Sequence, residues 1–170
     1  MNFKKYIKDV PDFPKEGIVF KDITPLLKNP EIFKKATEAL LSLLEIGAID
    51  KVVGVESRGF FFAPLLAAKL NAGFVPVRKA GKLPSNKISK SYALEYGEDI
   101  LEMHADSISK GEKVLVHDDV LATGGTAKAV CELVEDLGGI VVQCNFLIEL
   151  DFLAGRDKLK GYDVKSLIHY

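Results

Sequence analysis

A chain of 170 residues, 48% of them hydrophobic, buries roughly 70% of the surface that its unfolded form exposes, so we expect one domain spanning residues 1–170. Its 23 basic and 24 acidic side chains nearly balance, which excludes the global basic field that draws a protein onto nucleic acid. The charged N-terminus lacks an apolar secretion signal and no apolar stretch reaches the length of a membrane span, so we expect a cytoplasmic protein with neither a nucleic-acid nor a membrane partner.

The first 28 residues are interrupted too often for a long regular element. Isolated aromatic residues occur there among four turn-forming residues, Pro11, Pro14, Gly17 and Pro25. We therefore expect an irregular segment, residues 1–28, which we term the hood. Asn29-Pro30 has the pattern of an N-cap followed by proline at the first helical position, and apolar residues at helical spacing follow until Gly47. This pattern predicts an amphipathic helix.

Two repeated units predict the architecture of the remaining chain. Each has a short apolar run, a helical segment and a second apolar run; the first unit spans residues 52–77 and the second residues 114–148. Such β-α-β units indicate an α/β fold, with a parallel sheet flanked by helices on both faces. Ligands of such sheets bind at the carboxyl ends of the strands.

A long polar connection, residues 78–106, joins these two units. Basic residues come first, from Arg78 to Lys90, and acidic residues follow, from Glu95 to Asp106. A connection of this length inside a compact domain is usually functional. We expect a mobile active-site loop, part of which could be a β-hairpin.

The stretch from Val114 to Thr126 has the most informative pattern. An apolar strand ends in two consecutive acids, and a loop of small residues then opens a helix. The small residues leave room for an anion, towards which backbone N–H groups, the helix dipole and two threonine hydroxyls would point. The chain has no Walker A or Rossmann glycine pattern. We therefore expect a sugar phosphate, with its phosphate in the loop and its ribose hydroxyls at the acids.

These thirteen residues resemble the phosphoribosyl pyrophosphate (PRPP) motif of the type I phosphoribosyltransferases. Three further segments are similar to the adenine-specific branch of that family, in the same order along the chain: residues 11–24, residues 56–60, and residues 78–84 with 92–97. The resemblance implies the type I phosphoribosyltransferase fold, with an N-terminal hood and a flexible active-site loop. It also implies a homodimeric purine-salvage enzyme that forms AMP and pyrophosphate from adenine and PRPP.

The resemblance also implies roles for individual residues. The catalytic residues would be Glu95, which exchanges a proton with adenine, and Arg58. The sugar phosphate and the AMP product would contact Asp118, Asp119, Ala122, Thr123, Gly124, Gly125 and Thr126. Pyrophosphate would contact Glu56, Ser57, Arg58, Arg78, Lys79 and Lys82, and adenine would contact Val19, Phe20, Lys21 and Leu153. We expect no direct protein ligand to a metal, because Mg²⁺ would be held by substrate and water.

Two other functions stay open. One is a 6-oxopurine phosphoribosyltransferase, against which the hood sequence argues. The other is a non-catalytic PRPP-sensing regulator, which normally carries a DNA-binding domain and which the balanced charge disfavours. Two residues depart from the family pattern: Lys21 stands where arginine is frequent, and His117 replaces a usual aliphatic residue. We interpret His117 as a residue of the buried strand.

Overall fold

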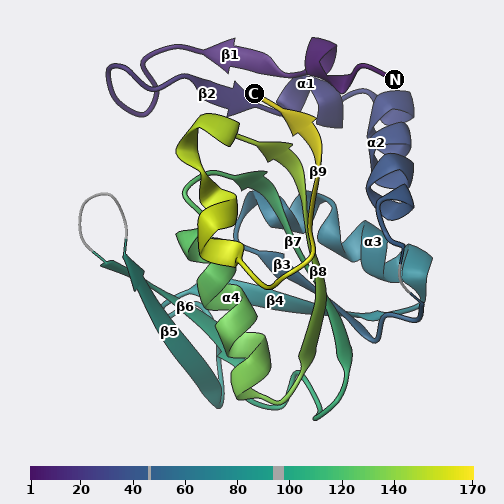
Figure 1. Ribbon diagram of the computed structural model, residues 1–170, viewed down its shortest axis with the longest axis vertical. Coiled ribbons are helices and arrows are strands. Elements are labelled where there is room, and N and C mark those ends of the chain that lie inside the picture. Colours follow the sequence, from purple (N-terminus) through teal and green to yellow (C-terminus); the bar gives the residue numbers. More distant parts are fainter. Residues whose placement is uncertain (46, 94–97) are drawn as a thin grey trace. The chain divides into compact units, whose positions relative to one another are not determined.

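The computed structural model describes residues 1–45, 47–93 and 98–170 (Figure 1). The chain divides into two compact units, Met1–Ala39 and Leu40–Tyr170. The single-domain organisation expected from chain length stays a prediction. In the parts of the chain that the structure describes, no helix has both the length and the apolar character needed to cross a bilayer.

The first unit contains more regular structure than the irregular hood predicted for residues 1–28. Its elements are a 3₁₀ helix (Phe3–Tyr6), strands β1 (Lys8–Val10) and β2 (Phe20–Asp22), which pair antiparallel, helix α1 (Thr24–Leu27) and the start of helix α2 (Pro30–Ser42). The predicted N-cap of α2 is confirmed, because the Asn29 side chain accepts a hydrogen bond of 3.2 Å from the Ile32 N–H. Short strands escape prediction here because three residues are too few to show a period.

A seven-stranded sheet with the order β5-β6-β4-β3-β7-β8-β9 forms the centre of the second unit. Its strands are β3 (Lys51–Val55), β4 (Gly73–Lys79), β5 (Lys87–Ala93), β6 (Glu98–His104), β7 (Lys113–Leu121), β8 (Ile140–Glu149) and β9 (Val164–His169). The five strands β4, β3, β7, β8 and β9 are parallel. The first four belong to the two predicted units and confirm the predicted parallel sheet, whereas β9 was not predicted. Strand β6 pairs antiparallel with both β4 and β5, so the sheet is mixed rather than wholly parallel.

The antiparallel strands come from the connection 78–106, which we expected to be largely a mobile loop. Its described residues are mostly the hairpin β5–β6, so the hairpin alternative is confirmed. The hairpin also contacts the helix that follows β7: Lys90 Nζ lies 3.4 Å from Glu132 Oε2 and 3.2 Å from Asp136 Oδ2. The sequence pattern did not show these strands, because polar residues occupy both of their faces.

Helices cover both faces of this sheet. A 3₁₀ helix (Arg58–Phe61) and helix α3 (Ala63–Leu70) connect β3 to β4, and helix α4 (Gly125–Asp136) connects β7 to β8. The two connections run outward from the middle of the sheet in opposite directions, so right-handed crossovers place α3 and α4 on opposite faces; Figure 1 shows α4 crossing the near face. The strand order therefore reverses between β3 and β7, and open α/β sheets bind their ligands at such a point.

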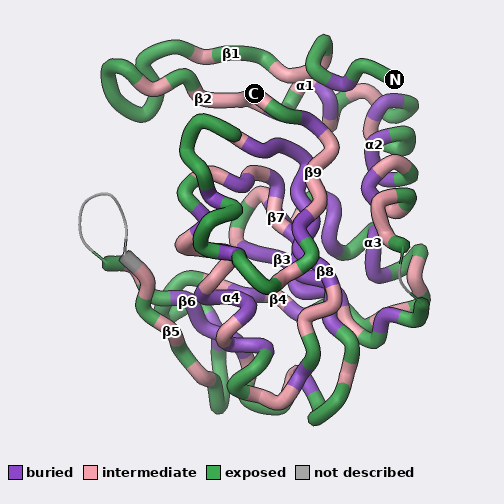
Figure 2. Tube along the Cα trace, in the orientation of Figure 1, coloured by how far each residue is buried: buried purple, intermediate pink, exposed green. Residues whose placement is uncertain are grey.

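The core of the second unit lies between the central strands and these helices, where Figure 2 shows the buried residues concentrated. Val53 of β3, Val116 of β7, Cys144 of β8 and Val130 of α4 are completely buried. Burying an aliphatic side chain of this kind contributes about 1.5–3 kcal/mol. Because both faces of the central strands are covered, these strands are continuous apolar runs in the sequence, and they could be predicted from it.

Candidate active site

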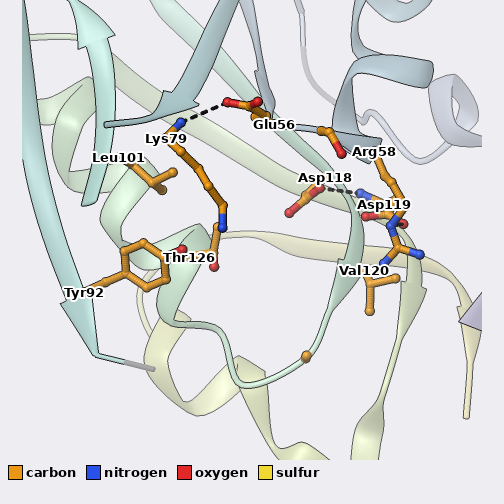
Figure 3. Close-up of a pocket in the computed structure, with 11 residues that line it drawn as sticks. Glu56, Arg58, Lys79, Tyr92, Leu101, Asp118, Asp119, Val120 and Thr126 are labelled. Carbon is orange, nitrogen blue, oxygen red and sulfur yellow. Dashed lines mark hydrogen bonds and ion pairs between the residues drawn. The ribbon is translucent and has the colours of Figure 1, made fainter. Parts of the chain in front are cut away.

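A cavity of about 270 Å³ lies at the carboxyl ends of β3 and β7, and Figure 3 shows its lining. Eight of its residues were predicted from the sequence: Glu56, Ser57, Arg58, Lys79, Asp118, Asp119, Ala122 and Thr126. Sequence reasoning missed three others: Tyr92, Leu101 and Val120. A smaller hollow of about 70 Å³ shares part of this lining and adds Thr123 and Gly124. The structure thus brings together the segment after β3, residues of β4, β5, β6 and β7, and the start of α4.

The loop after β7 has the backbone geometry of an anion site. Gly124 is the N-cap of α4 and adopts a left-handed conformation with φ +78° and ψ −3°. Glycine adopts this conformation without the steric cost that a Cβ atom brings. Gly125 begins the helix, so its first N–H groups and the positive end of its dipole lie beside the small hollow.

Gly155 supports this loop and was not predicted. A Cβ atom on Gly124 would lie 2.3 Å from the Gly155 carbonyl oxygen, and one on Gly155 would lie 2.2 Å from the Ala122 carbonyl oxygen. The adjacent Arg156 donates hydrogen bonds of 2.6 and 2.8 Å to the two carboxylate oxygens of the buried Glu149. The segment after β8 is therefore held against the loop, and only glycines permit this approach.

The two consecutive acids lie near the carboxyl end of β7, which continues for two residues beyond them to Leu121 instead of ending at them as predicted. Asp119 is buried and forms an ion pair of 2.9 Å with Arg58 Nε, whereas the Asp118 carboxylate accepts the Asp119 N–H at 2.8 Å. Burial and the neighbouring Asp119 charge raise the pKa of Asp118 well above its usual range. Burial also raises the pKa of Asp119, although Arg58 opposes this effect. Such crowded acids are stabilised by a ligand that donates hydrogen bonds to them.

The basic residues of the predicted pyrophosphate site are paired with acids. Glu56 Oε1 accepts hydrogen bonds from Lys82 Nζ at 2.7 Å and from Arg78 at 3.2 Å, and Glu56 Oε2 accepts the Lys79 N–H at 3.0 Å. Burial alone would raise the pKa of Glu56, but these hydrogen bonds lower it to about 2. Lys79 lines the cavity, whereas Arg78 and Lys82 reach it through Glu56.

Tyr92, in strand β5 of the hairpin β5–β6, lines the cavity. Its hydroxyl lies 3.3 Å from Asp99 Oδ2, which also accepts the Lys79 ammonium at 3.0 Å. In Figure 3 the Lys79 side chain extends past Leu101 towards Tyr92 and Thr126. A signal for Tyr92 was present, because it begins the segment 92–97 that resembles the adenine-specific branch. Glu95, the predicted proton-transfer residue in that segment, lies outside the described residues.

The predicted adenine contacts are distributed over the two units. In the first unit Val19 is 47% exposed, and the Phe20 ring packs edge-to-face on Phe13 with ring centroids 5.1 Å apart. The Lys21 ammonium lies 2.7 Å from Asp9 Oδ1, so its side chain is held along strand β1. In the second unit Leu153 ends the 3₁₀ helix Asp151–Leu153 and is 38% exposed.

One group of side chains has the composition of a metal site. Candidate ligand atoms of Glu149, Asp151 and His169 lie within 4.8 Å of one another. However, the Glu149 oxygens already accept hydrogen bonds from Arg156 and from Ser166, and His169 Nδ1 lies 2.9 Å from Asp151. These groups stabilise one another and do not fit a resident metal.

His117 is a core residue, as we interpreted it from the strand pattern. It is completely buried in β7, and its Nδ1 lies 2.7 Å from Asn145 Oδ1 on the neighbouring strand β8. Burial lowers the pKa of His117 from its ordinary value of 6.5 to about 4, although the hydrogen bond to Asn145 opposes this shift. The imidazole is therefore neutral at physiological pH.

This shift predicts a loss of stability in acid. In the unfolded chain His117 takes up a proton below pH 6.5, whereas in the folded protein it does so only near pH 4. The free energy of unfolding is therefore unaffected by His117 above pH 6.5 and decreases as the pH falls from 6.5 to about 4. In His117→Leu, the decrease in the free energy of unfolding from pH 7 to pH 4 should be smaller than in the native protein by about 3 kcal/mol. Urea denaturation at the two pH values measures this difference. Equal decreases in both proteins would show that His117 contributes nothing to the pH dependence.

Comparisons with known proteins agree with this site. The family model of the phosphoribosyl transferase domain matches residues 22–168 of this chain. The adenine phosphoribosyltransferase of Christiangramia forsetii is 63% identical over 100% of this chain and 99% of its own. The crystal structure of the enzyme of that name from Thermoanaerobacter pseudethanolicus is 52% identical, covers 99% of this chain and 98% of its own, and has a TM-score of 0.97.

A third relative is the adenine phosphoribosyltransferase of Saccharomyces cerevisiae, solved in complex with D-2,5-dideoxy-2,5-imino-altritol 1,6-bisphosphate and adenine. It is 46% identical, with a TM-score of 0.93, and the match covers 97% of this chain and 96% of the yeast chain. Full-length identity, the shared fold and the cavity at the β7–α4 loop point to one assignment. The chain belongs to the phosphoribosyltransferase family, and within it to the adenine phosphoribosyltransferases.

Proposed function

We propose that this protein catalyses a glycosyl transfer in purine salvage, joining adenine to the ribose 5-phosphate of PRPP and releasing pyrophosphate and AMP. The observation that carries this proposal is that the small-residue loop at the start of α4 and the acids of β7 line the same cavity. The loop fits a 5-phosphate, and the acids fit the hydroxyls of its ribose. The full-length relatives named for adenine support this base over the 6-oxopurines.

The positive charge that develops on the ribose ring during the reaction would account for the two acids beside it. Displacement of pyrophosphate from C1 passes through a transition state in which the ring is cationic, so nearby carboxylates stabilise it. Asp118 and Asp119 would hold the ribose hydroxyls and supply this negative charge. Arg58, which already orients Asp119 at 2.9 Å, would link the acid pair to the departing pyrophosphate.

The leaving group requires positive charge and hydrogen-bond donors. The backbone N–H groups of Glu56 and Ser57, the Arg58 side chain, and the cations Arg78, Lys79 and Lys82 would hold pyrophosphate. Mg²⁺ bound to substrate oxygens and water would neutralise part of its charge, and the carboxylates lining the cavity are compatible with a hydrated ion. The contacts of the phosphate and AMP would be Ala122, Thr123, Gly124, Gly125 and Thr126.

Recognition of the base would use Val19, Phe20, Lys21 and Leu153, and Glu95 would exchange a proton with the imidazole edge of adenine as N9 attacks. By resemblance to the family, the lysine-bearing stretch 78–90 would close over the site and exclude water from the activated sugar. A homodimer is also part of the proposal. Two exposed apolar side chains support such an interface: Phe61 (42%), which ends the 3₁₀ helix before α3, and Leu65 (39%) in the first turn of α3. A cytoplasmic location stays a prediction.

Binding of PRPP to a Gly124→Ala variant tests the phosphate loop. The new Cβ would press on the Gly155 carbonyl at 2.3 Å, which displaces the loop, so we expect binding weaker by ~10²-fold. Isothermal titration with PRPP and Mg²⁺ measures it. Gly161→Ala is the matched control, since Gly161 also has a positive φ (+99°) but its Cβ would meet nothing within 4 Å.

The control variant should lose about 1 kcal/mol of stability and bind PRPP as the native protein does. Circular dichroism and thermal unfolding establish that both variants are folded. Native affinity in folded Gly124→Ala would remove this loop from the site, and failure of the native protein to bind PRPP would contradict the proposed function.

A further inference from the structure

Every basic residue proposed for pyrophosphate is already paired with a carboxylate. Arg58 pairs with Asp119, Lys79 pairs with Asp99, and both Arg78 and Lys82 pair with Glu56. Pyrophosphate carries several negative charges, so binding it with these groups requires that some of the cations leave their carboxylates. The question is which acid gives up its cations.

Glu56 differs from the other acids in the number of donors that it collects. It accepts from Lys82 at 2.7 Å, from two nitrogens of Arg78 at 3.2 and 3.3 Å, and from the Lys79 N–H at 3.0 Å. Its side chain is only 9% exposed and lines the cavity. One carboxylate therefore occupies a set of donors that a phosphate group would also fit.

The cations of this set are more exposed than the acid. The Arg78 side chain is 35% exposed and that of Lys82 is 49% exposed, whereas Glu56 is fixed at the end of β3. Arg78, in the last residues of β4, also donates to the Lys82 carbonyl at 3.3 Å, so it is joined to the turn that carries Lys82. A flexible lysine stem and an arginine fork can move from the carboxylate to a neighbouring anion while that turn stays in place.

We propose that the Glu56 carboxylate is a built-in counter-anion that holds Arg78 and Lys82 in the ligand-free enzyme and is replaced by the pyrophosphate group of the substrate. This inference rests on the proposed function, and it makes Glu56 a positioning residue rather than a catalytic one. After replacement, Glu56 and pyrophosphate are like charges in one cavity, so the same carboxylate favours release of the product. The low pKa of Glu56, about 2, keeps it ionised throughout the working pH range.

Glu56→Gln tests the proposal, because it removes the charge and preserves the shape. We expect Mg²⁺-pyrophosphate to bind this variant about tenfold more tightly, which corresponds to 1.4 kcal/mol. The KM for PRPP and the turnover number should both fall, since product release slows. Affinity for AMP, which has no pyrophosphate, should be unchanged.

Glu102→Gln is the matched control. Glu102 is equally buried, at 9% exposure, and likewise holds a lysine (Lys87, at 3.1 Å) and a backbone N–H (Gly81, at 3.0 Å), but it does not line the cavity. Its substitution should leave pyrophosphate affinity unchanged. A second variant, Lys82→Met, keeps the proposal testable if Glu56→Gln does not fold: it should bind pyrophosphate about tenfold more weakly.

The results distinguish an error in the proposed pyrophosphate site from an error in the counter-anion role of Glu56. If the native protein does not bind Mg²⁺-pyrophosphate, the proposed pyrophosphate site itself is wrong. If it does, unchanged or weaker pyrophosphate binding in Glu56→Gln would overturn the counter-anion role, as would an equal change in AMP affinity. Unchanged binding in Lys82→Met would also overturn it, because Lys82 would then serve only the ion pair with Glu56.

Discussion

The native protein is expected to use adenine at least ~10⁴-fold more efficiently than hypoxanthine, as measured by kcat/KM. Adenine presents a 6-amino donor beside an N1 acceptor, and hypoxanthine presents a 6-oxo acceptor beside an N1 donor. The resemblance to the adenine-specific branch assigns the reading of this edge to the Val19 carbonyl and the Lys21 N–H. Main-chain groups cannot exchange donor and acceptor character, so hypoxanthine would leave buried polar groups unpaired.

Lys21→Arg is the control for this prediction. The Lys21 ammonium lies 2.7 Å from Asp9 Oδ1 in the β1–β2 pair, so its side chain has a partner within the hood. Because the group proposed to read the base is main chain, arginine at this position should leave the preference for adenine intact. Comparable specificity constants for adenine and hypoxanthine in either protein would contradict the hood model.

Glu95→Gln should lower the turnover number by ~10²–10⁴-fold, the range typical of a lost general acid–base group. Glutamine keeps the size of the side chain and can still form hydrogen bonds, but it cannot exchange a proton at adenine N7 as N9 attacks. The effect should therefore appear in turnover and not in the affinity for PRPP. Steady-state rates of AMP formation, together with PRPP titration, measure the two quantities.

Glu98→Gln is the matched control, because Glu98 is an exposed acid at the start of β6 in the same hairpin. This variant should retain the native rate. A near-native rate for Glu95→Gln would exclude Glu95 as the proton-transfer residue, and Tyr96 would become the next candidate to substitute.

The parts of the fold that could be predicted from the sequence are those with buried, regular patterns. Strands β3 and β7 are continuous apolar runs because both faces of the sheet are covered, and α4 shows a clear helical period bounded by glycines. Only an indication of the hairpin β5–β6 was present in the sequence, because both of its strands carry charged residues. In the structure Lys90 of β5 forms ion pairs with α4, and Asp99 of β6 forms one with Lys79 of β4.

The site was predictable where its residues are contiguous. The acids of β7 and the loop before α4 occupy one short stretch, so backbone geometry alone indicates an anion site. Gly155 could not be found in this way, because its role is defined by a carbonyl 2.3 Å from a Cβ that Gly124 lacks, and the two glycines are distant in sequence. The pairing of Arg78 and Lys82 with Glu56 also depends on tertiary contacts, and the sequence alone indicates only that basic residues cluster there.

Product formation by the native protein tests the central claim most directly. Purified protein would be incubated with PRPP, Mg²⁺ and adenine, and AMP and pyrophosphate would be quantified together by chromatography, with a parallel reaction that lacks the base. The account predicts that AMP and pyrophosphate appear in equal amounts and only when adenine is present. Tight binding of PRPP without any formation of AMP would contradict it, and would indicate instead a protein that senses PRPP without using it.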